Sequence, residues 1–462
     1  MPVKLVQSAA SAYPYPLLIK QLLLTPLAIA PDQEITYQGK LRYNYRTLNE
    51  RIGRLANGLA GLGVEAGQTV AMMDWDSHRY LECFFAVPMM GAILQTVNVR
   101  LSPEQILYTL NHAKADVLLV NGEFFPILAQ IAPSLETVKT FVFFSDEAAT
   151  PTAPVAMSAE YESMLAKALP DYSFPEFDEN AQATTFYTTG TTGNPKGVYF
   201  SHRQLVLHTL GCAAALGGAN AQGHIHREDV YMPMTPMFHV HAWGFPYLAT
   251  MMGVKQVYPG RYQPDVICRL ISEEGVSFSH CVPTILHMIL SHPKARTTDF
   301  TGLKILIGGA AMPEAMAISA QKRGMDLFTG YGMSETCPVL SLAHLDSADL
   351  KLTLEEQAVI RAKTGRPLPL VDLRIVDPEM AEVAHDGKAT GEVVVRAPWL
   401  TQGYVGAPDA SEDLWAGGYL HTADIGNINP AGYLKVTDRI KDVIKTGGEW
   451  TSSLQLEDII AK

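Results

Sequence analysis

Residues 187–197, YTTGTTGNPKG, have the composition of a phosphate-binding loop. Glycines allow successive backbone N–H groups to converge in a concave nest, and threonine hydroxyls add uncharged donors. Lys196 supplies one positive charge. The stretch is not a Walker A loop, because Pro195 stands where that motif needs glycine and Gly197 follows the lysine. A plain glycine-rich turn is the alternative. The residues predicted to bind phosphate are Thr188, Thr189, Gly190, Thr191, Thr192, Gly193 and Lys196.

Two further glycine-containing stretches could contact a ligand. GYGMSET (330–336) resembles a nucleophile elbow, but Thr336 replaces its last glycine. Taken alone, the stretch could be a solvated loop. IGGAAMP (307–313) turns on two glycines, which permit close approach of the backbone to a flat ring or simply a tight turn.

Histidine, aspartate and arginine occur in three other stretches. PMFHVHAWG (236–244) contains His239 and His241, but no cysteine or carboxylate completes a metal site at a familiar spacing. A partly buried structural histidine is therefore the default interpretation. Asp424 in YLHTADIG and Arg439 in DRIKD each follow a β-like stretch, and the two could form a surface ion pair.

The elements that position these residues alternate between helix and strand in the first third of the chain. A capping box at Thr47–Glu50 predicts a helix ending at Gly61 and Gly63, followed by a buried strand at 68–74. Ser102 caps a second helix, and 116–120 follows as a strand. Alternation of this kind indicates an α/β fold with a largely parallel sheet.

The rest of the chain divides into three parts. Residues 145–180 read as a connecting surface segment, and 187–197 lies between two β-rich stretches, which predicts a hairpin followed by a helix from Ser201. A second alternating region follows. From about 365 onward, short strands at 371–377, 391–397 and 432–438 predict a small β-rich subdomain.

Composition limits the class of protein. The 462 residues suggest about three structural units, and a net charge of −12 without a block of Lys or Arg excludes a general nucleic-acid surface. Five scattered cysteines argue against a disulfide framework. The longest apolar run, 83–94, is too short to span a bilayer, and no signal peptide is evident. We expect a cytoplasmic protein without a membrane span.

YTTGTTGNPKG resembles the phosphate loop of the adenylate-forming enzymes, which include acyl-CoA and aryl-CoA synthetases, luciferases and peptide-synthetase adenylation domains. The other stretches repeat the family's order. This resemblance implies an N-terminal domain (1–437) of two α/β sheet subdomains and a small distorted β-barrel (about 365–437). Residues 438–462 resemble the hinge, with Lys441 at its pivot, and the start of a lid that is otherwise missing. We expect a truncated chain that catalyses adenylation poorly, because the family's lid lysine has no counterpart.

The resemblance also implies roles for individual residues. The threonine–glycine loop and Lys196 would hold the phosphates of ATP, Glu335 would ligate Mg²⁺, and Thr336 would touch the α-phosphate. Tyr331 would stack on adenine, and His239 would border the carboxylate of the acid. The remaining implied contacts are Gly309 and Ala310 beside the adenine and the carboxylate, Gly332 beside nucleotide and acid, Asp424 and Arg439 on the ribose, and Trp243 at the acyl tunnel.

The implied reaction converts a carboxylic acid and ATP to an acyl-adenylate and pyrophosphate, and then transfers the acyl group to coenzyme A. VHAWG and the ending KTGGEW are similar to medium- and long-chain fatty acyl-CoA synthetases. The substrates would be a fatty acid, ATP and CoA, with Mg²⁺, and a homodimer is a family expectation. Alternatives are a ligase for an aryl, branched or thioether acid, a lidless module that binds acyl-adenylate without turnover, and a kinase-like ATPase.

Overall fold

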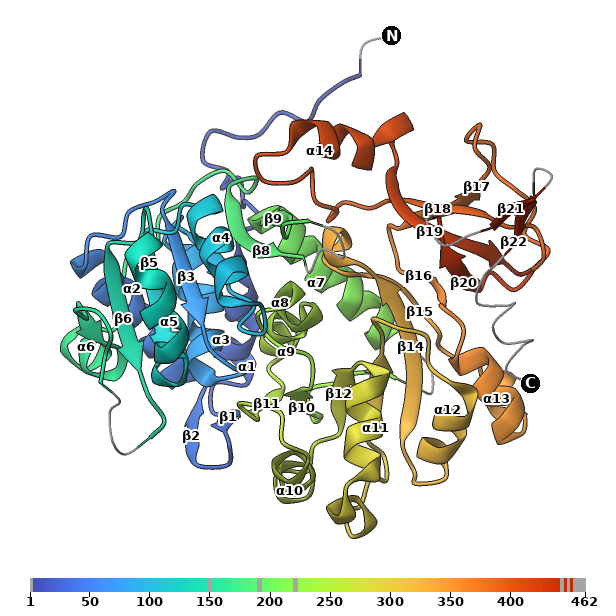
Figure 1. Cartoon of the computed structure of the whole chain (residues 1–462), viewed down its shortest axis with the longest axis horizontal. Helices are drawn as coiled ribbons and strands as arrows, with labels where there is room; N and C mark the ends of the chain where they lie inside the picture. Colours follow the sequence, from blue (N-terminus) through green and yellow to red (C-terminus); the bar gives the residue numbers. More distant parts are fainter. Residues whose placement is uncertain are drawn as a thin grey trace.

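The computed structural model describes residues 3–147, 152–188, 193–218 and 223–440, and the backbone of 444–446 and 449–451. Figure 1 shows two α/β units side by side, with a smaller β-rich unit at the upper right. The predicted α/β fold with two sheet-containing subdomains is confirmed.

The first unit contains a seven-stranded sheet in the order β7-β6-β5-β3-β4-β8-β9. Only the pair β8 and β9 is antiparallel. Every residue of β3 and β5 is buried, because helices cover both faces of the sheet. The strands are β3 (Thr69–Met73), β4 (Ile93–Thr96), β5 (Val117–Asn121), β6 (Thr140–Phe144), β7 (Ala159–Glu160), β8 (Gln182–Tyr187) and β9 (Gly197–Ser201).

Six helices accompany this sheet, and two of them differ from the sequence prediction. The first begins at Tyr45 rather than after Thr47, because the side chain of Asn44 accepts the Thr47 backbone N–H and caps the helix earlier. The segment 145–180 contains β7 and a helix as well as connecting chain. The predicted capping boxes at Ser102 and Ser201 are confirmed. The helices are α2 (Tyr45–Gly61), α3 (His78–Met89), α4 (Pro103–His112), α5 (Phe125–Ile131), α6 (Tyr161–Lys167) and α7 (His202–Gly217).

The second unit contains a nine-stranded sheet in the order β16-β15-β14-β13-β12-β10-β11-β1-β2. Its central strands are parallel, and antiparallel pairs close both edges. The strands are β1 (Glu34–Tyr37), β2 (Leu41–Asn44), β10 (Val230–Pro233), β11 (Lys255–Tyr258), β12 (Phe278–Cys281), β13 (Lys304–Ile307), β14 (Asp326–Gly332), β15 (Val339–Leu342) and β16 (Arg366–Pro367). The helices are α1 (Leu24–Ile29), α8 (Val240–Trp243), α9 (Phe245–Met252), α10 (Pro264–Glu274), α11 (Pro283–Ser291), α12 (Glu314–Gln321) and α13 (Leu354–Arg361).

The predicted β-rich subdomain is a four-stranded antiparallel sheet. A short helix precedes its third strand along the chain. Its elements are β17 (Asp372–Val376), β18 (Gly391–Arg396), α14 (Pro408–Leu414), β19 (Leu420–Ile428) and β20 (Leu434–Arg439). The hairpin of β21 (Ile444–Thr446) and β22 (Glu449–Thr451) follows. The proposed domain boundary at 437/438 falls within β20 and stays a prediction. Lys441 lies outside the described residues.

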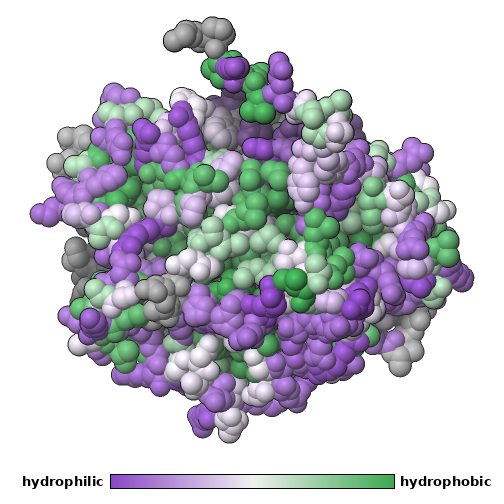
Figure 2. Space-filling view, turned by 180° about the vertical axis from the view of Figure 1, so that it is seen from behind, coloured by the Kyte–Doolittle hydropathy of each residue, from purple (hydrophilic) through white to green (hydrophobic). Residues whose placement is uncertain are grey.

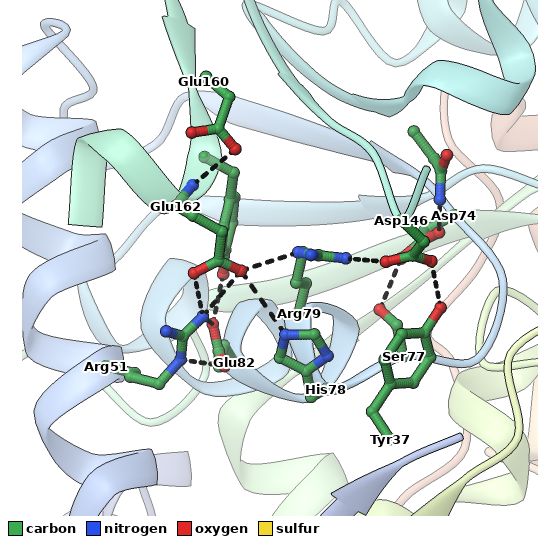
Figure 3. Close-up of polar contacts among 12 residues, drawn as sticks. Tyr37, Arg51, Asp74, Ser77, His78, Arg79, Glu82, Asp146, Glu160 and Glu162 are labelled. Carbon is green, nitrogen blue, oxygen red and sulfur yellow. Dashed lines mark hydrogen bonds and ion pairs between the residues drawn. The ribbon is translucent and has the colours of Figure 1, made fainter. Parts of the chain in front are cut away.

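A buried charge network joins α2, α3 and α6 in the first unit (Figure 3). Glu82 is fully buried and accepts a hydrogen bond of 2.7 Å from Arg51. The Arg79 guanidinium lies between Glu162, at 3.0 Å, and Asp146, at 2.9 Å. Removing one partner of such a buried pair leaves an uncompensated charge, so the network holds these helices in one arrangement. It thereby fixes the start of α3.

The surface seen in Figure 2, from behind the view of Figure 1, has hydrophobic residues gathered in its middle and hydrophilic residues around them. Within the described ranges, no helix is both long enough and apolar enough to cross a membrane.

Candidate active site

A cavity opens at the carboxyl ends of the second sheet's parallel strands, with about 610 Å³ of space including its mouth. In a sheet of this type, loops at the carboxyl ends commonly form ligand sites. The lining residues come from the ends of β12, β13 and β14, from the start of β15 and from the segment around α8: His239, Val240, Trp243, Val282, Leu306, Gly308, Gly309, Gly330, Tyr331, Gly332, Met333, Ser334, Pro338 and Val339.

Two glycines in the cavity wall occupy positions that disfavour any side chain. Gly309 adopts φ +75°, a conformation that side chains disfavour. Gly332 lies so close to the opposite strand that a Cβ there would be 1.7 Å from the Pro338 carbonyl oxygen. Ala310, predicted beside Gly309, is exposed and is not one of the lining residues.

Tyr331 connects the cavity to the β-rich unit. Its hydroxyl donates to Asp424 Oδ2 at 2.6 Å, and Arg439 Nε donates to Asp424 Oδ1 at 2.7 Å. The register of β19 and β20 places Asp424 directly opposite Arg439. Burial raises the pKa of Asp424, while Tyr331 and Arg439 oppose that shift. The Asp–Arg pair is thus half-buried and connected to a cavity wall, which a simple surface ion pair would not be.

The segment that carries His239 and Trp243 has an unusual backbone. Val240 through Gly244 all have φ between 46° and 77°, so five consecutive residues lie in the left-handed region. This conformation costs about 1–2 kcal/mol for each non-glycine residue. It turns His239 and Trp243 toward the cavity, whereas His241 is fully buried among aromatic rings. Burial lowers the pKa of His239, and the nearby Arg100 adds to that effect.

Trp243 forms one wall of the cavity. Its indole packs on His280 with 5.2 Å between ring centroids, and it reaches the backbone beside Gly308. A Cβ at Gly308 would lie 2.9 Å from the indole, so glycine is required for this contact. The remaining lining side chains on this side are aliphatic.

The predicted phosphate loop is the turn between β8 and β9, as expected. The Thr188 backbone N–H donates to the Lys196 carbonyl at 3.0 Å, and the Thr188 hydroxyl accepts from the Lys196 N–H at 3.3 Å. Gly193 has φ +93° with open space beside its Cα. Lys196 is exposed, with its Nζ 4.6 Å from the ring centroid of Tyr404. The other four predicted residues, Thr189, Gly190, Thr191 and Thr192, lie outside the described residues.

Glu335 and Thr336 form a short helical turn next to the cavity-lining Ser334. The Glu335 side chain is buried and accepts a hydrogen bond of 2.7 Å from the Tyr404 hydroxyl. The Thr336 hydroxyl is bonded to the Met333 and Pro338 carbonyls, so contact with a phosphate would require this hydroxyl to change partners.

The structure therefore brings most of the predicted residues into one region. His239, Trp243, Gly309, Tyr331 and Gly332 line the cavity itself. Asp424 and Arg439 join it through Tyr331, and Lys196 and Glu335 meet through Tyr404. The assigned roles of all these residues stay predictions.

Three contributors were missed by sequence reasoning: Tyr404, Asp76 and Thr96. No motif marks Tyr404, which lies in the turn TQGYVG. Asp76 lies in the first unit, yet its carboxyl group accepts from the Met237 backbone N–H at 2.8 Å, just before His239. Thr96 adds a hydrogen bond of 3.0 Å to the Phe238 carbonyl. The position of the His239 segment thus depends on both units.

Comparison with known proteins identifies the family. The model of a family described as AMP-binding enzyme matches residues 27–405. A long-chain-fatty-acid–CoA ligase of Thermus thermophilus is 40% identical over 422 residues, covering 91% of this chain and 75% of the relative. A 3-methylmercaptopropionyl-CoA ligase of Ruegeria lacuscaerulensis is 35% identical, covering 96% of this chain and 84% of the relative.

Among solved structures, the anthranilate CoA ligase AuaEII in complex with anthranoyl-AMP superposes with a TM-score of 0.82 at 21% identity, covering 97% of this chain and 82% of the other. That likeness shows a shared fold. The extent of the family match and the identity to curated ligases establish more: this chain belongs to the AMP-binding enzyme family, as an AMP-forming acid–CoA ligase.

Proposed function

We propose that this enzyme is a fatty acyl-CoA synthetase, which activates a medium- or long-chain carboxylic acid as acyl-AMP and then transfers the acyl group to CoA. The observation that carries the proposal is the apolar wall around Trp243. Val240, Val282, Leu306 and Val339 accompany the indole, directly beside the residues assigned to the nucleotide. Burial of methylene groups against such a wall is favourable, at about 0.8 kcal/mol for each CH₂.

The described cavity lining also supports an acid that carries no amino group. Its described lining residues include no aspartate or glutamate. An amino acid substrate would bury an ammonium group here without a partner, at a large free-energy cost. The Thermus relative, a long-chain-fatty-acid–CoA ligase, agrees with this preference.

In the adenylation step, the carboxylate oxygen attacks the α-phosphorus of ATP and pyrophosphate leaves. Two anions must approach each other, so the protein has to reduce their repulsion. Lys196 would neutralise phosphate charge, and Tyr331 with Asp424 would orient the nucleoside. His239 has its pKa lowered by burial. A neutral imidazole there can donate one hydrogen bond to the acid without fixing it in an ion pair.

The residues present also fit a magnesium ion. Glu335 is a buried carboxylate that forms no ion pair within the described part of the chain, and Mg²⁺ in nucleotide sites commonly uses one or two carboxylates plus phosphate oxygens. Glu335 would hold the ion, which would supply charge neutralisation at the phosphates. The Tyr404 hydroxyl fixes the carboxylate's orientation. A homodimer and a cytoplasmic location stay predictions.

A thioether acid is the second candidate. The observation that favours it is the Ruegeria relative, named a 3-methylmercaptopropionyl-CoA ligase, which aligns with 96% of this chain. A short thioether chain would also pack against the apolar wall, so the wall alone does not separate the two candidates.

The test is acid-dependent exchange of labelled pyrophosphate into ATP, with straight-chain acids from butyrate to stearate, 3-methylmercaptopropionate, benzoate and an amino acid. We expect exchange to be fastest with a medium- or long-chain acid, and to fall by orders of magnitude in Lys196→Ala. Exchange that is fastest with 3-methylmercaptopropionate would select the second candidate. Formation of ADP without exchange would indicate γ-phosphoryl transfer and contradict both. Tight binding of acyl-AMP without exchange would indicate a binding module.

A further inference from the structure

We propose that Tyr404 is a positioning residue that keeps Lys196 and Glu335 apart and directs both toward the nucleotide. The proposal rests on the function proposed above, in which these two residues act on the phosphates and their metal ion. Tyr404 itself belongs to no predicted motif. The aromatic ring of Tyr404 contacts the Lys196 ammonium, and its hydroxyl donates a hydrogen bond to the Glu335 carboxylate.

The first step of the argument is electrostatic. A buried carboxylate and an ammonium near it attract each other, and an ion pair would occupy both groups. Tyr404 offers each group a weaker partner instead. The Lys196 Nζ lies 4.6 Å from the ring centroid, and the hydroxyl donates to Glu335 at 2.7 Å. A phosphate or a metal ion can displace such partners more readily than it can break an ion pair.

The second step concerns the backbone around Tyr404. Tyr404 pairs with Val198 in an isolated β-bridge, and the Val405 N–H donates to the Gly197 carbonyl at 2.9 Å. These contacts attach the segment to the phosphate-loop hairpin immediately after Lys196. The position of the tyrosine ring relative to Lys196 is therefore set by main-chain bonds.

The same segment is attached to the Glu335 turn. The Thr401 N–H donates to the Glu335 carbonyl at 2.9 Å, and the Thr401 hydroxyl donates to the Tyr199 carbonyl at 2.9 Å. Trp399, which is fully buried, packs on Gly211 of α7 and anchors the start of the segment. Residues 399–405 thus hold the phosphate-loop hairpin and the Glu335 turn in fixed positions relative to each other. Tyr404 lies between the Lys196 and Glu335 side chains.

The test compares Tyr404→Phe, which keeps the ring and removes the hydroxyl, with Tyr404→Leu, which removes both. The probe is a non-hydrolysable ATP analogue, titrated by calorimetry with and without Mg²⁺. Without Mg²⁺, we expect Tyr404→Phe to bind the analogue within about twofold of the wild-type affinity. The increase in affinity that Mg²⁺ gives should be about tenfold smaller than in wild type, because the variant has lost a hydrogen bond to a charged group. Tyr404→Leu should lose affinity in both conditions, because Lys196 and Glu335 can then pair directly.

A matched control exists in the β-rich unit. The Tyr419 hydroxyl donates a hydrogen bond of 3.0 Å to the Asp372 carboxylate. The Arg396 guanidinium lies 3.7 Å from the centroid of the Tyr419 ring. Tyr419→Phe should leave analogue binding unchanged. Thermal unfolding of each variant separates loss of folding from loss of binding.

A double-variant cycle with Glu335→Gln tests the mechanism directly. The effect of Tyr404→Phe on the Mg²⁺-dependent gain should disappear in the Glu335→Gln background. An equal effect in both backgrounds, or wild-type Mg²⁺ dependence in Tyr404→Phe, would overturn the proposal. Neither result would affect the proposed function, which depends on acid-dependent pyrophosphate exchange by the wild-type enzyme.

Discussion

The carboxyl group of Asp76 accepts a hydrogen bond of 2.8 Å from the backbone N–H of Met237, 161 positions further along the chain. The Tyr262 hydroxyl donates to the other oxygen of the same group. Asp76 follows β3 of the first sheet, whereas Met237 precedes His239 in the second unit. This side chain therefore helps to place the strained segment that lines the cavity.

The first prediction concerns the pH dependence of stability at Asp76. Burial raises its pKa to about 8, against about 4 in an unfolded chain. Between these values the folded protein holds a proton that the unfolded chain has lost, so the free energy of unfolding falls as the pH rises from 5 to 9. Asp76→Asn removes this contribution. We expect the fall, measured by urea unfolding at both pH values, to shrink by about 2–4 kcal/mol.

Burial also raises the pKa of Asp74, to about 7. Part of the fall in unfolding free energy with pH should therefore remain in Asp76→Asn. The control is Asp409→Asn, at an exposed aspartate in α14, which should leave the slope as in wild type. A slope in Asp76→Asn equal to that of wild type would show that Asp76 is ionised in the folded protein at neutral pH.

The second prediction concerns nucleotide binding at Asp424. Asp424→Asn removes the charge that Arg439 and the Tyr331 hydroxyl share, with little change of shape. We expect the affinity for AMP to fall by about 10- to 100-fold, the range for hydrogen bonds to a charged group. Calorimetric titration with AMP measures the change.

Asp372 provides the matched control for that variant. It also accepts from a tyrosine hydroxyl, that of Tyr419, and from an arginine, Arg374, but it lies on β17 away from the cavity. Asp372→Asn should bind AMP as tightly as wild type. If the two variants lose affinity equally, the loss reflects general stability and Asp424 has no specific role.

Sequence reasoning succeeded where the signal is local. The hairpin around 187–197, the capping boxes at Ser102 and Ser201, and the strands of the β-rich unit depend on residues within a few positions of one another. The register of β19 and β20, which sequence reasoning did not address, places Asp424 opposite Arg439.

The features that sequence reasoning missed depend on distant contacts or on strain. Tyr404 and Glu335 are 69 positions apart, and nothing in either segment indicates that they meet. The left-handed conformation of Val240 contradicts the preference of a β-branched residue, so no propensity argument could predict it. Such a conformation persists because the surrounding contacts, Asp76 and Thr96 among them, hold the segment in place.

The third prediction concerns substrate selection at Trp243. Trp243→Ala removes the wall that packs on His280 and enlarges the cavity. We expect kcat/KM for the shortest accepted acids to fall by about tenfold, because they lose apolar contact worth 1–3 kcal/mol, while longer acids are less affected. Trp243→Phe keeps an aromatic wall and should give an intermediate profile. A uniform loss across all chain lengths in both variants would place Trp243 in the structural core and not in the acid site.

The fourth prediction concerns Gly332, where the backbone of β14 approaches Pro338. In Gly332→Ala the added methyl would lie 1.7 Å from the Pro338 carbonyl oxygen, and a main-chain atom cannot move away as a flexible side chain would. The pairing of β14 and β15 must then open, which we expect to lower the free energy of unfolding by about 1–3 kcal/mol and to weaken AMP binding. Gly61→Ala, in open space at the end of α2, should be neutral or slightly stabilising. Urea unfolding with and without AMP measures both effects, and a Gly332→Ala midpoint equal to that of wild type would contradict the close approach of these two strands.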